Sequence, residues 1–391
     1  MASISCNGLA QELLDRCLRG GAGKSELLRR LLSNGCDEEF LRVVVEGLSD
    51  RFEPRLCEVY AELMGDVLGG TGLRPGAADR PETSPTKVYV LSRVTLGADV
   101  AITSVILDGV KKRFPKAEIL FAASRKSWEL FAADPRIGHL PLSYPRTGSL
   151  KDRLAPVLSL RGVFSQPGAI VIDPDSRITQ LGLLPVCEPE NYYYFPSRSY
   201  GGDGKESLTT LTRRWVAARF GVEASAYIAP LPGDDPGPAV TLSLGVGENP
   251  AKRIAVPFER DLLLALTDRG FRIYIDKGAG GEETQRVERA IEGLPVRTWH
   301  GSFAPFASAI SRSRLYIGYD SAGQHVAAAC GVPLVTIFAG FPTERMFQRW
   351  QPTGPGRIEV VRVDDPEPRA VLERTLRAID QGQYDGRWRN L

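Results

Sequence analysis

The chain has 391 residues, of which 43% are hydrophobic and 25% are charged, and its formal net charge is +2. This composition is typical of a folded protein with room for two or three domains, and the small net charge argues against a protein that binds nucleic acid or another polyanion. No run of ~18 apolar residues occurs, so no membrane-spanning helix is expected.

The N-terminus and the cysteines both indicate a cytoplasmic protein. The first residues, MASISCNGLAQELL, lack the charged region and the long apolar region of a secretory signal. The cysteines are scattered and form no CxxC pair, which favours free thiols and argues against a zinc cluster. They are Cys6, Cys17, Cys36, Cys57, Cys187 and Cys330.

Residues 1–68 are predicted to be a helical region, because apolar residues recur there at helical spacing in four successive stretches. Four short amphipathic helices can form a small bundle of their own or pack on the rest of the protein, and the sequence leaves both arrangements open. Residues 69–86, GGTGLRPGAADRPETSPT, are rich in glycine and proline and are predicted to be a linker.

Residues 87–232 alternate between strand and helix patterns, which predicts a parallel sheet covered by helices on both faces. The predicted strands are 88–91, 118–121 and 169–173. The predicted helices are 103–114, a segment around Trp128, and 209–220. An aromatic run, Tyr192 to Phe195, lies in a stretch predicted to be irregular, where its rings either belong to the core or stack on a ligand.

A second linker, 231–238, leads to another α/β half at 239–365, followed by a C-terminal helix and tail at 366–391. The predicted strands are 239–244, 271–275, 296–299, 315–317 and 334–338. The predicted helices surround 262–266, 286–291, 303–311 and 326–330, with the closing helix at 371–379. The fold class is therefore α/β, with two Rossmann-like halves and an extra N-terminal helical region.

Residues 315–333, LYIGYDSAGQHVAAACGVP, hold the strongest functional signal. A short buried strand leads through a polar turn into a helix of small residues, which Gly331 is placed to end. In open α/β sheets ligands bind at the carboxyl ends of strands, and a helix N-terminus favours an anion. Taken singly, the aspartate is also a good helix cap and the histidine could simply be packed.

This segment resembles the D-[TS]-G-x-x-H-[LV]-A-A-A signature of glycosyltransferase family 9, the heptosyltransferase-like enzymes. The chain has one residue more, since Asp320-Ser321-Ala322-Gly323 stands where the family has three residues, and His325 follows. The resemblance implies a GT-B architecture, with two Rossmann-like domains facing a cleft. It also implies that the C-terminal half binds a nucleotide-diphosphate sugar, by analogy ADP-heptose, and that the N-terminal half binds the acceptor.

The resemblance implies a catalytic base at Asp99. The family has Gly-Asp-[VIL] in its first loop, and this chain has Gly97-Ala98-Asp99 with one alanine inserted. A carboxylate there could take a proton from the acceptor hydroxyl as its oxygen attacks the anomeric carbon. Without the resemblance, an aspartate at the start of a helix is expected to be an N-cap.

The resemblance places the donor site in loops of the second half. Lys252 lies in a loop where the family has a lysine and would contact the diphosphate, although a solvated surface lysine has the same appearance. Glu282 follows the turn Gly278 to Gly281 and would bind ribose hydroxyls, with Glu283 as a competitor. Asp320, Ser321, Gly323 and His325 complete the predicted set, in which backbone amides and His325 reach phosphate oxygens.

The resemblance implies an inverting glycosyltransferase with no cofactor besides its donor substrate, and the absence of an Asp-x-Asp motif in a suitable loop predicts that it is metal-independent. The letters Asp173-Pro174-Asp175 match a metal motif but lie in the acceptor half. The sequence does not distinguish a glycan, a lipid-linked sugar and a protein side chain as the acceptor. It also leaves open whether the protein contacts the inner face of the membrane and what its oligomeric state is. A GT-B-like epimerase or hydrolase, or a non-catalytic glycan- or partner-binding protein, remains an alternative.

Overall fold

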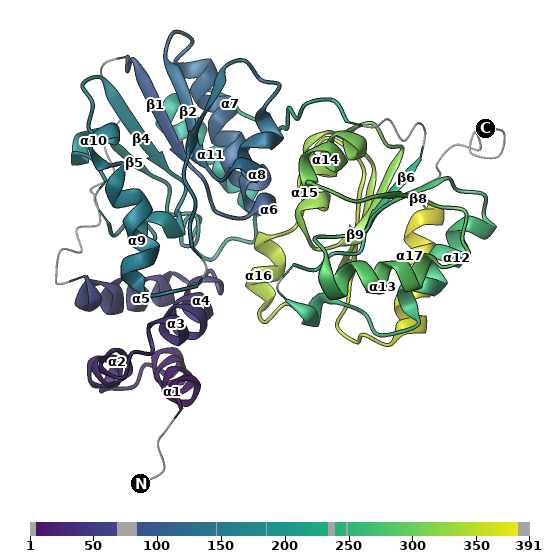
Figure 1. Ribbon diagram of the computed structural model, residues 1–391, viewed down its shortest axis with the longest axis horizontal. Helices are drawn as coiled ribbons and strands as arrows, with labels where there is room; N and C mark the ends of the chain where they lie inside the picture. The colour runs from purple at the N-terminus through teal and green to yellow at the C-terminus, as the bar shows by residue number, and fades with distance from the viewer. Residues whose placement is uncertain are drawn as a thin grey trace.

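The computed structural model describes residues 5–68, 84–145, 147–184, 186–233, 239–247 and 249–381. A small helical bundle packs below the first of two α/β halves, and the second half lies beside the first (Figure 1). None of the helices in these ranges combines the length and the apolar character needed to cross a membrane. Residues 69–83, most of the predicted first linker, lie outside the description, as do 234–238 of the second.

The bundle confirms the helical prediction for the N-terminal region. Its helices are α1 (Cys6–Arg19), α2 (Lys24–Ser33), α3 (Asp37–Glu39), α4 (Glu46–Ser49) and α5 (Pro54–Val67), with a π-helical segment η1 (Phe40–Val45) between α3 and α4. Their apolar stripes meet in one core, which also takes in Leu150, Leu154, Leu181 and Leu183 of the first α/β half. The bundle is thus joined to that half by a shared apolar core.

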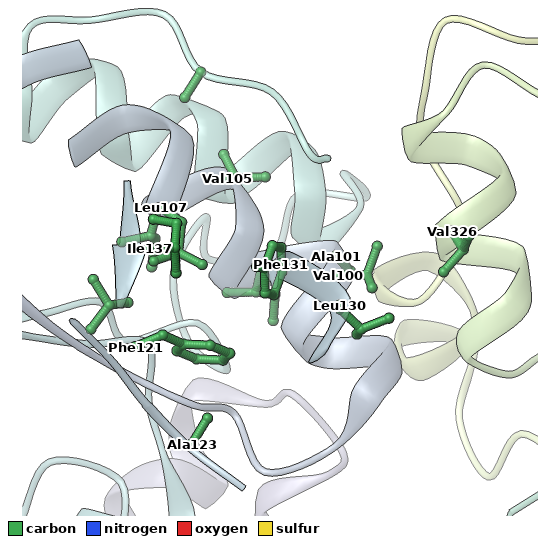
Figure 2. Close-up of a cluster of buried hydrophobic side chains, with 14 of the residues drawn as sticks. Val100, Ala101, Val105, Leu107, Phe121, Ala123, Leu130, Phe131, Ile137 and Val326 are labelled. Atoms are coloured by element: carbon green, nitrogen blue, oxygen red, sulfur yellow. The ribbon is translucent and has the colours of Figure 1, made fainter. Parts of the chain in front are cut away.

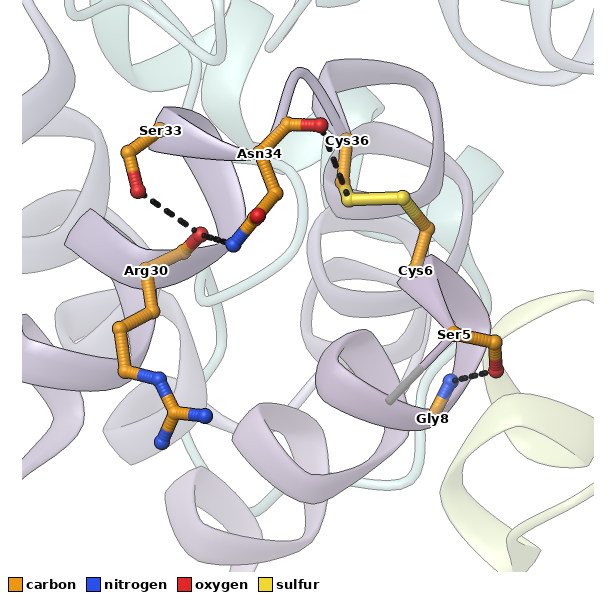
Figure 3. Close-up of a disulfide and its surroundings, with 7 residues drawn as sticks. All are labelled: Ser5, Cys6, Gly8, Arg30, Ser33, Asn34 and Cys36. Carbon is orange, nitrogen blue, oxygen red and sulfur yellow. Dashed lines mark hydrogen bonds between the residues drawn. A yellow bond between two sulfur atoms is a disulfide. The ribbon is translucent and has the colours of Figure 1, made fainter. Parts of the chain in front are cut away.

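A disulfide joins Cys6 and Cys36 and corrects the prediction that all cysteines are free thiols (Figure 3). Cys6 is the first residue of α1 and Cys36 precedes α3, so the bond ties together two ends of the bundle. Thirty positions separate the two residues, and only the reversal of the chain between α1 and α2 brings them together. Cys17, Cys187 and Cys330 are free thiols.

The first half is built on a five-stranded parallel sheet in the order β3-β2-β1-β4-β5. Its strands are β1 (Lys87–Leu91), β2 (Glu118–Ala123), β3 (Ile137–Pro141), β4 (Ala169–Asp173) and β5 (Tyr192–Tyr194). Its helical elements are α6 (Leu96–Ala98), η2 (Asp99–Thr103), α7 (Ser104–Arg113), α8 (Arg125–Trp128), η3 (Glu129–Phe131), α9 (Leu150–Ser159), α10 (Arg161–Phe164), η4 (Arg177–Thr179), η5 (Pro189–Asn191) and α11 (Leu208–Phe220).

The aromatic run, 192–195, contains the short strand β5. Of the two interpretations, core packing or stacking on a ligand, the structure supports core packing. Tyr192, Tyr193 and Phe195 are buried. The Tyr192 hydroxyl donates to Asp173 at 2.5 Å, and the Tyr194 hydroxyl donates to Asp175 at 2.7 Å. An edge strand of three residues is short enough to escape a periodicity test.

The second half carries a six-stranded parallel sheet in the order β11-β10-β9-β6-β7-β8. Its strands are β6 (Val240–Ser243), β7 (Ile273–Asp276), β8 (Arg297–Trp299), β9 (Leu315–Tyr319), β10 (Leu334–Phe338) and β11 (Ile358–Arg362). Its helices are η6 (Pro250–Lys252), α12 (Phe258–Asp268), α13 (Gly281–Ile291), α14 (Phe303–Ser311), α15 (Ala322–Ala329), α16 (Glu344–Arg349) and α17 (Pro368–Gln381). All five strands predicted for this half are present, and β11 was not predicted.

The two halves meet in a shared apolar core rather than across open solvent. Figure 2 shows Val326 of α15 opposite Val100 and Ala101 of the first half. The backbone also comes close here, because a Cβ added to Gly97 of α6 would lie 3.4 Å from Ala322 Cα and from His325 Cδ2. The start of the signature helix α15 therefore faces the loop that carries Asp99.

Candidate functional site

The candidate site lies where β9 ends and α15 begins, at the carboxyl edge of the second sheet. Lys252 reaches this point from η6, and its Nζ lies 2.6 Å from Asp320 Oδ2 and 3.1 Å from the Asp320 carbonyl oxygen. The Asp320 side chain is 5% exposed and that of Lys252 is 16% exposed. The structure thus brings together two predicted donor-site residues as an ion pair at the helix start.

Gln324 belongs to the same cluster and was not predicted. Its Nε2 donates to Asp320 Oδ1 at 2.5 Å and to the Trp350 carbonyl at 3.2 Å, while its Oε1 accepts from the Thr336 hydroxyl at 2.6 Å. These bonds fix the Asp320 carboxylate between an amide and an ammonium group. A glutamine directly before His325, in an alanine-rich helix, was the available signal.

His325 is buried directly after Gln324. Burial lowers its pKa to about 4, with a smaller effect of the same sign from Lys252, while Asp320 opposes the shift. Its Nε2 lies 3.3 Å from Gln324 Nε2, and its ring lies 5.8 Å from the Trp350 ring. The imidazole is therefore neutral near pH 7, and it can donate one hydrogen bond but cannot act as a cation.

The lowered pKa of His325 predicts that the stability of the fold depends on pH. Its pKa is lower in the folded chain, about 4, than the unfolded value of about 6.5. The unfolded state then binds more protons between these values, and this group's contribution to stability falls as the pH drops through that window. The loss is of order 3 kcal/mol in total. Urea unfolding of the wild type and of His325→Gln at pH 7 and pH 4.5 checks it: the stability difference between the two proteins must change with pH.

Gly323 is needed in α15 because of the residue beneath it. A Cβ at Gly323 would lie 2.1 Å from the Tyr316 hydroxyl oxygen, and Tyr316 of β9 is fully buried. Ser321 stands at the N-cap position with an extended backbone, and its side chain makes no capping hydrogen bond. The packing of Tyr316 thus brings the first turn of α15 close onto the sheet, with its first amides at the strand ends.

Glu283, and not Glu282, folds over the glycine turn that follows β7. Glu282 is exposed in the first turn of α13. Glu283 Oε2 accepts from the Ala279 amide at 3.2 Å. The Glu283 carboxylate also lies close to Gly245, because a Cβ added to Gly245 would be 2.5 Å from Glu283 Oε1. Of the two competing glutamates, Glu283 is the one whose side chain faces the loop after β6. The neighbouring carboxyl of Asp276 has its pKa raised to about 6, chiefly by burial.

Asp99 is fully buried and is not an N-cap. Its Oδ2 accepts from the Ser92 hydroxyl at 2.7 Å, and its Oδ1 accepts from the Arg93 amide at 2.7 Å and the Thr103 hydroxyl at 2.9 Å. Burial raises the pKa of this carboxyl, and the hydrogen bonds oppose the rise. The carboxylate does not face an open cleft in this structure, because the loop after β1 wraps around it.

The π-helical turn η2 gives a physical account of the inserted residue. Asp99 is its first residue, directly after the three-residue helix α6. A π turn closes over one residue more than an α turn, and such turns are frequent at functional sites. The Asp99 carboxylate points back to the loop after β1, where it accepts from Ser92 and Arg93.

The two other aspartates of the first half are engaged in structural contacts. Asp173 accepts from the Ser176 amide at 2.7 Å and from the hydroxyls of Thr179 and Tyr192, and burial raises its pKa to about 6. Asp175 is buried against Arg198 at 3.2 Å, and Arg198 and Arg93 hold its pKa low against the effect of burial. Among the described residues, no three His, Cys, Asp or Glu side chains stand close enough to hold a metal ion.

Comparison with known proteins bears on the second half most directly. Residues 254–370 match the model of glycosyltransferase family 9 (heptosyltransferase). The chain is 30% identical over 100 residues to lipopolysaccharide heptosyltransferase 3 of Escherichia coli. The aligned segment covers 24% of this chain and 28% of that protein. The matched segment thus spans little more than a quarter of that relative.

Solved structures share the fold of both halves. The family 9 glycosyltransferase of Veillonella parvula is 16% identical and has a TM-score of 0.58, covering 78% of this chain and 98% of its own. The E. coli heptosyltransferase WaaC with ADP is 15% identical and has a TM-score of 0.57, covering 76% and 99%. The GT-B fold expected from the sequence is confirmed, and within that fold residues 254–370 are similar to glycosyltransferase family 9 (heptosyltransferase).

Proposed function

We propose that this protein transfers a sugar from a nucleotide diphosphate, ADP-heptose by likeness to its relatives, to a hydroxyl acceptor with inversion at the anomeric carbon. The observation that carries the proposal is the cluster at the start of α15. There Lys252, paired with Asp320 at 2.6 Å, stands beside the first amides of a helix within the family-matched segment. An ammonium group and helix amides together suit a diphosphate.

In the proposed reaction the donor's diphosphate lies at α15, where Lys252 and the helix amides bind its oxygens. The Ser321 and Gly323 amides belong to that first turn, and neutral His325 donates one N–H. The acceptor oxygen attacks the anomeric carbon, its proton passes to a base, and the nucleoside diphosphate leaves with the bonding electrons. Negative charge then grows on the leaving oxygen, which these donors stabilise.

We assign the base to Asp99, whose raised pKa suits proton abstraction. Its Oδ2 accepts from the Ser92 hydroxyl and its Oδ1 from the Arg93 amide and the Thr103 hydroxyl, and the Ser127 side chain also donates to this carboxylate. We propose that the acceptor hydroxyl takes the place of Ser92 at Oδ2. For the ribose, Glu283 joins Glu282 as a candidate, because its carboxylate already faces the loop after β6.

The acceptor class follows from the relatives only in outline. One relative is named lipopolysaccharide heptosyltransferase 3. Our first candidate for the acceptor is therefore a lipopolysaccharide-core sugar, ahead of another glycan or a protein side chain. A cytoplasmic location, at the inner face of the membrane for a lipid-linked acceptor, accords with this function and is proposed with it.

Calorimetry on the full chain tests the donor assignment. ADP, UDP and GDP are titrated in turn, and ADP is expected to bind most tightly. ADP-heptose is then incubated with and without a candidate acceptor: transfer requires both substrates, whereas steady sugar release or isomerisation without acceptor indicates a hydrolase or epimerase. Absence of binding by all three diphosphates would remove the proposal.

Activity is expected to persist in excess EDTA. The carboxylate closest to the proposed diphosphate position, Asp320, is already engaged by Lys252 and Gln324, so the neutralising charge is expected to come from Lys252 and the helix amides. Rates measured before and after chelation are compared, with magnesium added back as a control. Complete loss with EDTA and recovery with magnesium would show that the mechanism needs a metal.

A further inference from the structure

Phe52, in the loop between α4 and α5, is the point at which the N-terminal bundle enters the junction of the two halves. The other buried apolar side chains described for the bundle belong to the bundle's own core. Phe52, 1% exposed, belongs instead to the apolar cluster that the two halves share. Its backbone has a φ of +59°, a region that glycine favours and phenylalanine rarely adopts.

The contacts of Phe52 reach into the second half. Its ring meets the Trp350 ring edge to face, with centroids 5.9 Å apart and planes at 83°. Its carbonyl oxygen accepts from Arg345 Nε of α16, and the same guanidinium donates to the Gly202 carbonyl of the first half. The bundle loop, the first half and α16 therefore meet around one arginine and one aromatic pair.

Trp350 carries this contact to the candidate donor site. Its carbonyl oxygen accepts from Gln324 Nε2 at 3.2 Å, and its ring lies 5.8 Å from the ring of His325. Gln324 in turn holds Asp320, the partner of Lys252. One chain of packed and hydrogen-bonded side chains thus connects Phe52 with the start of α15.

The bundle side of this connection is fixed to the first half by charge. Arg177 Nη2 donates to both oxygens of Asp50 at 3.1 Å, and Arg177 Nη1 lies 2.7 Å from Glu46 Oε1. The arginines Arg177, Arg198 and Arg93 hold the pKa of Asp50 below its usual value. Phe52, two residues after Asp50, is therefore presented from an anchored loop.

We propose that Phe52 is a positioning residue for the donor site: it holds Trp350, and through Trp350 it sets the placement of Gln324 and His325 at the start of α15. The inference rests on the proposed function of that site as the diphosphate position. It gives the N-terminal bundle a role in the binding of the nucleotide sugar.

The test measures ADP affinity by calorimetry on folded, full-length variants. Phe52→Ala is expected to weaken ADP binding about tenfold. The matched control is Leu31→Ala, which removes a fully buried side chain from the bundle core without touching the junction, and it should leave affinity within twofold of the wild type. If Phe52→Ala fails to fold, Phe52→Gly replaces it, because glycine adopts the local backbone conformation readily.

A double-mutant cycle tests the route through Trp350. In a Trp350→Ala background, the further change Phe52→Ala should alter ADP affinity less than twofold, since the residue through which it acts is gone. Equal affinity of wild type and Phe52→Ala (or Phe52→Gly) would overturn the inference, and so would additive losses in the double variant. Failure of the wild type itself to bind ADP would instead refute the proposed function.

Discussion

Asp99→Asn is expected to lower the rate of sugar transfer by about 10²–10⁴-fold, the usual contribution of a general base, with ADP affinity almost unchanged. The structure explains why asparagine should be tolerated. Its Oδ1 can keep the bonds from the Arg93 amide and the Thr103 hydroxyl, and its Nδ2 can donate to Ser92 Oγ, which then accepts where it now donates. The fold is kept and the proton acceptor is lost.

Thr103→Val is the matched control for this experiment. Valine has a shape similar to that of threonine, and Thr103 is as deeply buried as Asp99. The change removes one hydrogen bond to the Asp99 carboxylate but leaves the carboxylate itself in place. Steady-state rates with saturating donor, together with thermal unfolding of each variant, separate chemistry from stability. A rate for Asp99→Asn near that of the wild type would show that Asp99 only organises the loop after β1, and that the base lies elsewhere.

Lys252→Met is expected to weaken ADP binding by about 1–3 kcal/mol, the range for hydrogen bonds to charged groups. It should also destabilise the fold, because the Asp320 carboxylate, 5% exposed, loses the ammonium group 2.6 Å away. Removing one partner of a buried ion pair costs about 3–5 kcal/mol. Calorimetry with ADP and urea unfolding measure the two effects separately.

The double variant Lys252→Met with Asp320→Asn distinguishes the two roles of this lysine. Asparagine can still accept from Gln324 Nε2 and carries no charge, so most of the lost stability should return. ADP affinity should stay low, because no ammonium group faces the diphosphate. Recovery of affinity together with stability would mean that Lys252 serves only to neutralise Asp320.

Local patterns in the sequence were enough for the architecture. Strands such as β6, β9 and β10 are short apolar runs, and helices such as α12 and α17 show a regular apolar stripe, so each could be recognised from neighbouring residues alone. The strand-turn-helix order of residues 315–333 placed Asp320, Gly323 and His325 at a strand end, since chain connectivity fixes that geometry. The strands that escaped prediction, β3, β5 and β11, are edge strands of their sheets.

The chemical state of the site depended on contacts that the sequence does not display. Asp99 is buried among hydrogen-bond donors, of which Ser92 and Arg93 belong to the loop after β1, and its availability as a base could not be inferred from its position before a helix. The sequence favoured Glu282, with Glu283 as a competitor, and only the fold of the turn shows that the Glu283 side chain lies close to Gly245. His325 is neutral because surrounding side chains exclude water from it.

The sequence by itself determined two α/β halves, a helical N-terminal region and a family 9 signature, because these are properties of short stretches and of their order. The tertiary structure alone decided that Cys6 meets Cys36, and that Phe52 meets Arg345, 293 positions away, at the junction of the two halves. Such contacts arise when separately folded segments pack together, and no local periodicity records which surfaces will meet. The place of the bundle beside the candidate donor site is a consequence of that packing.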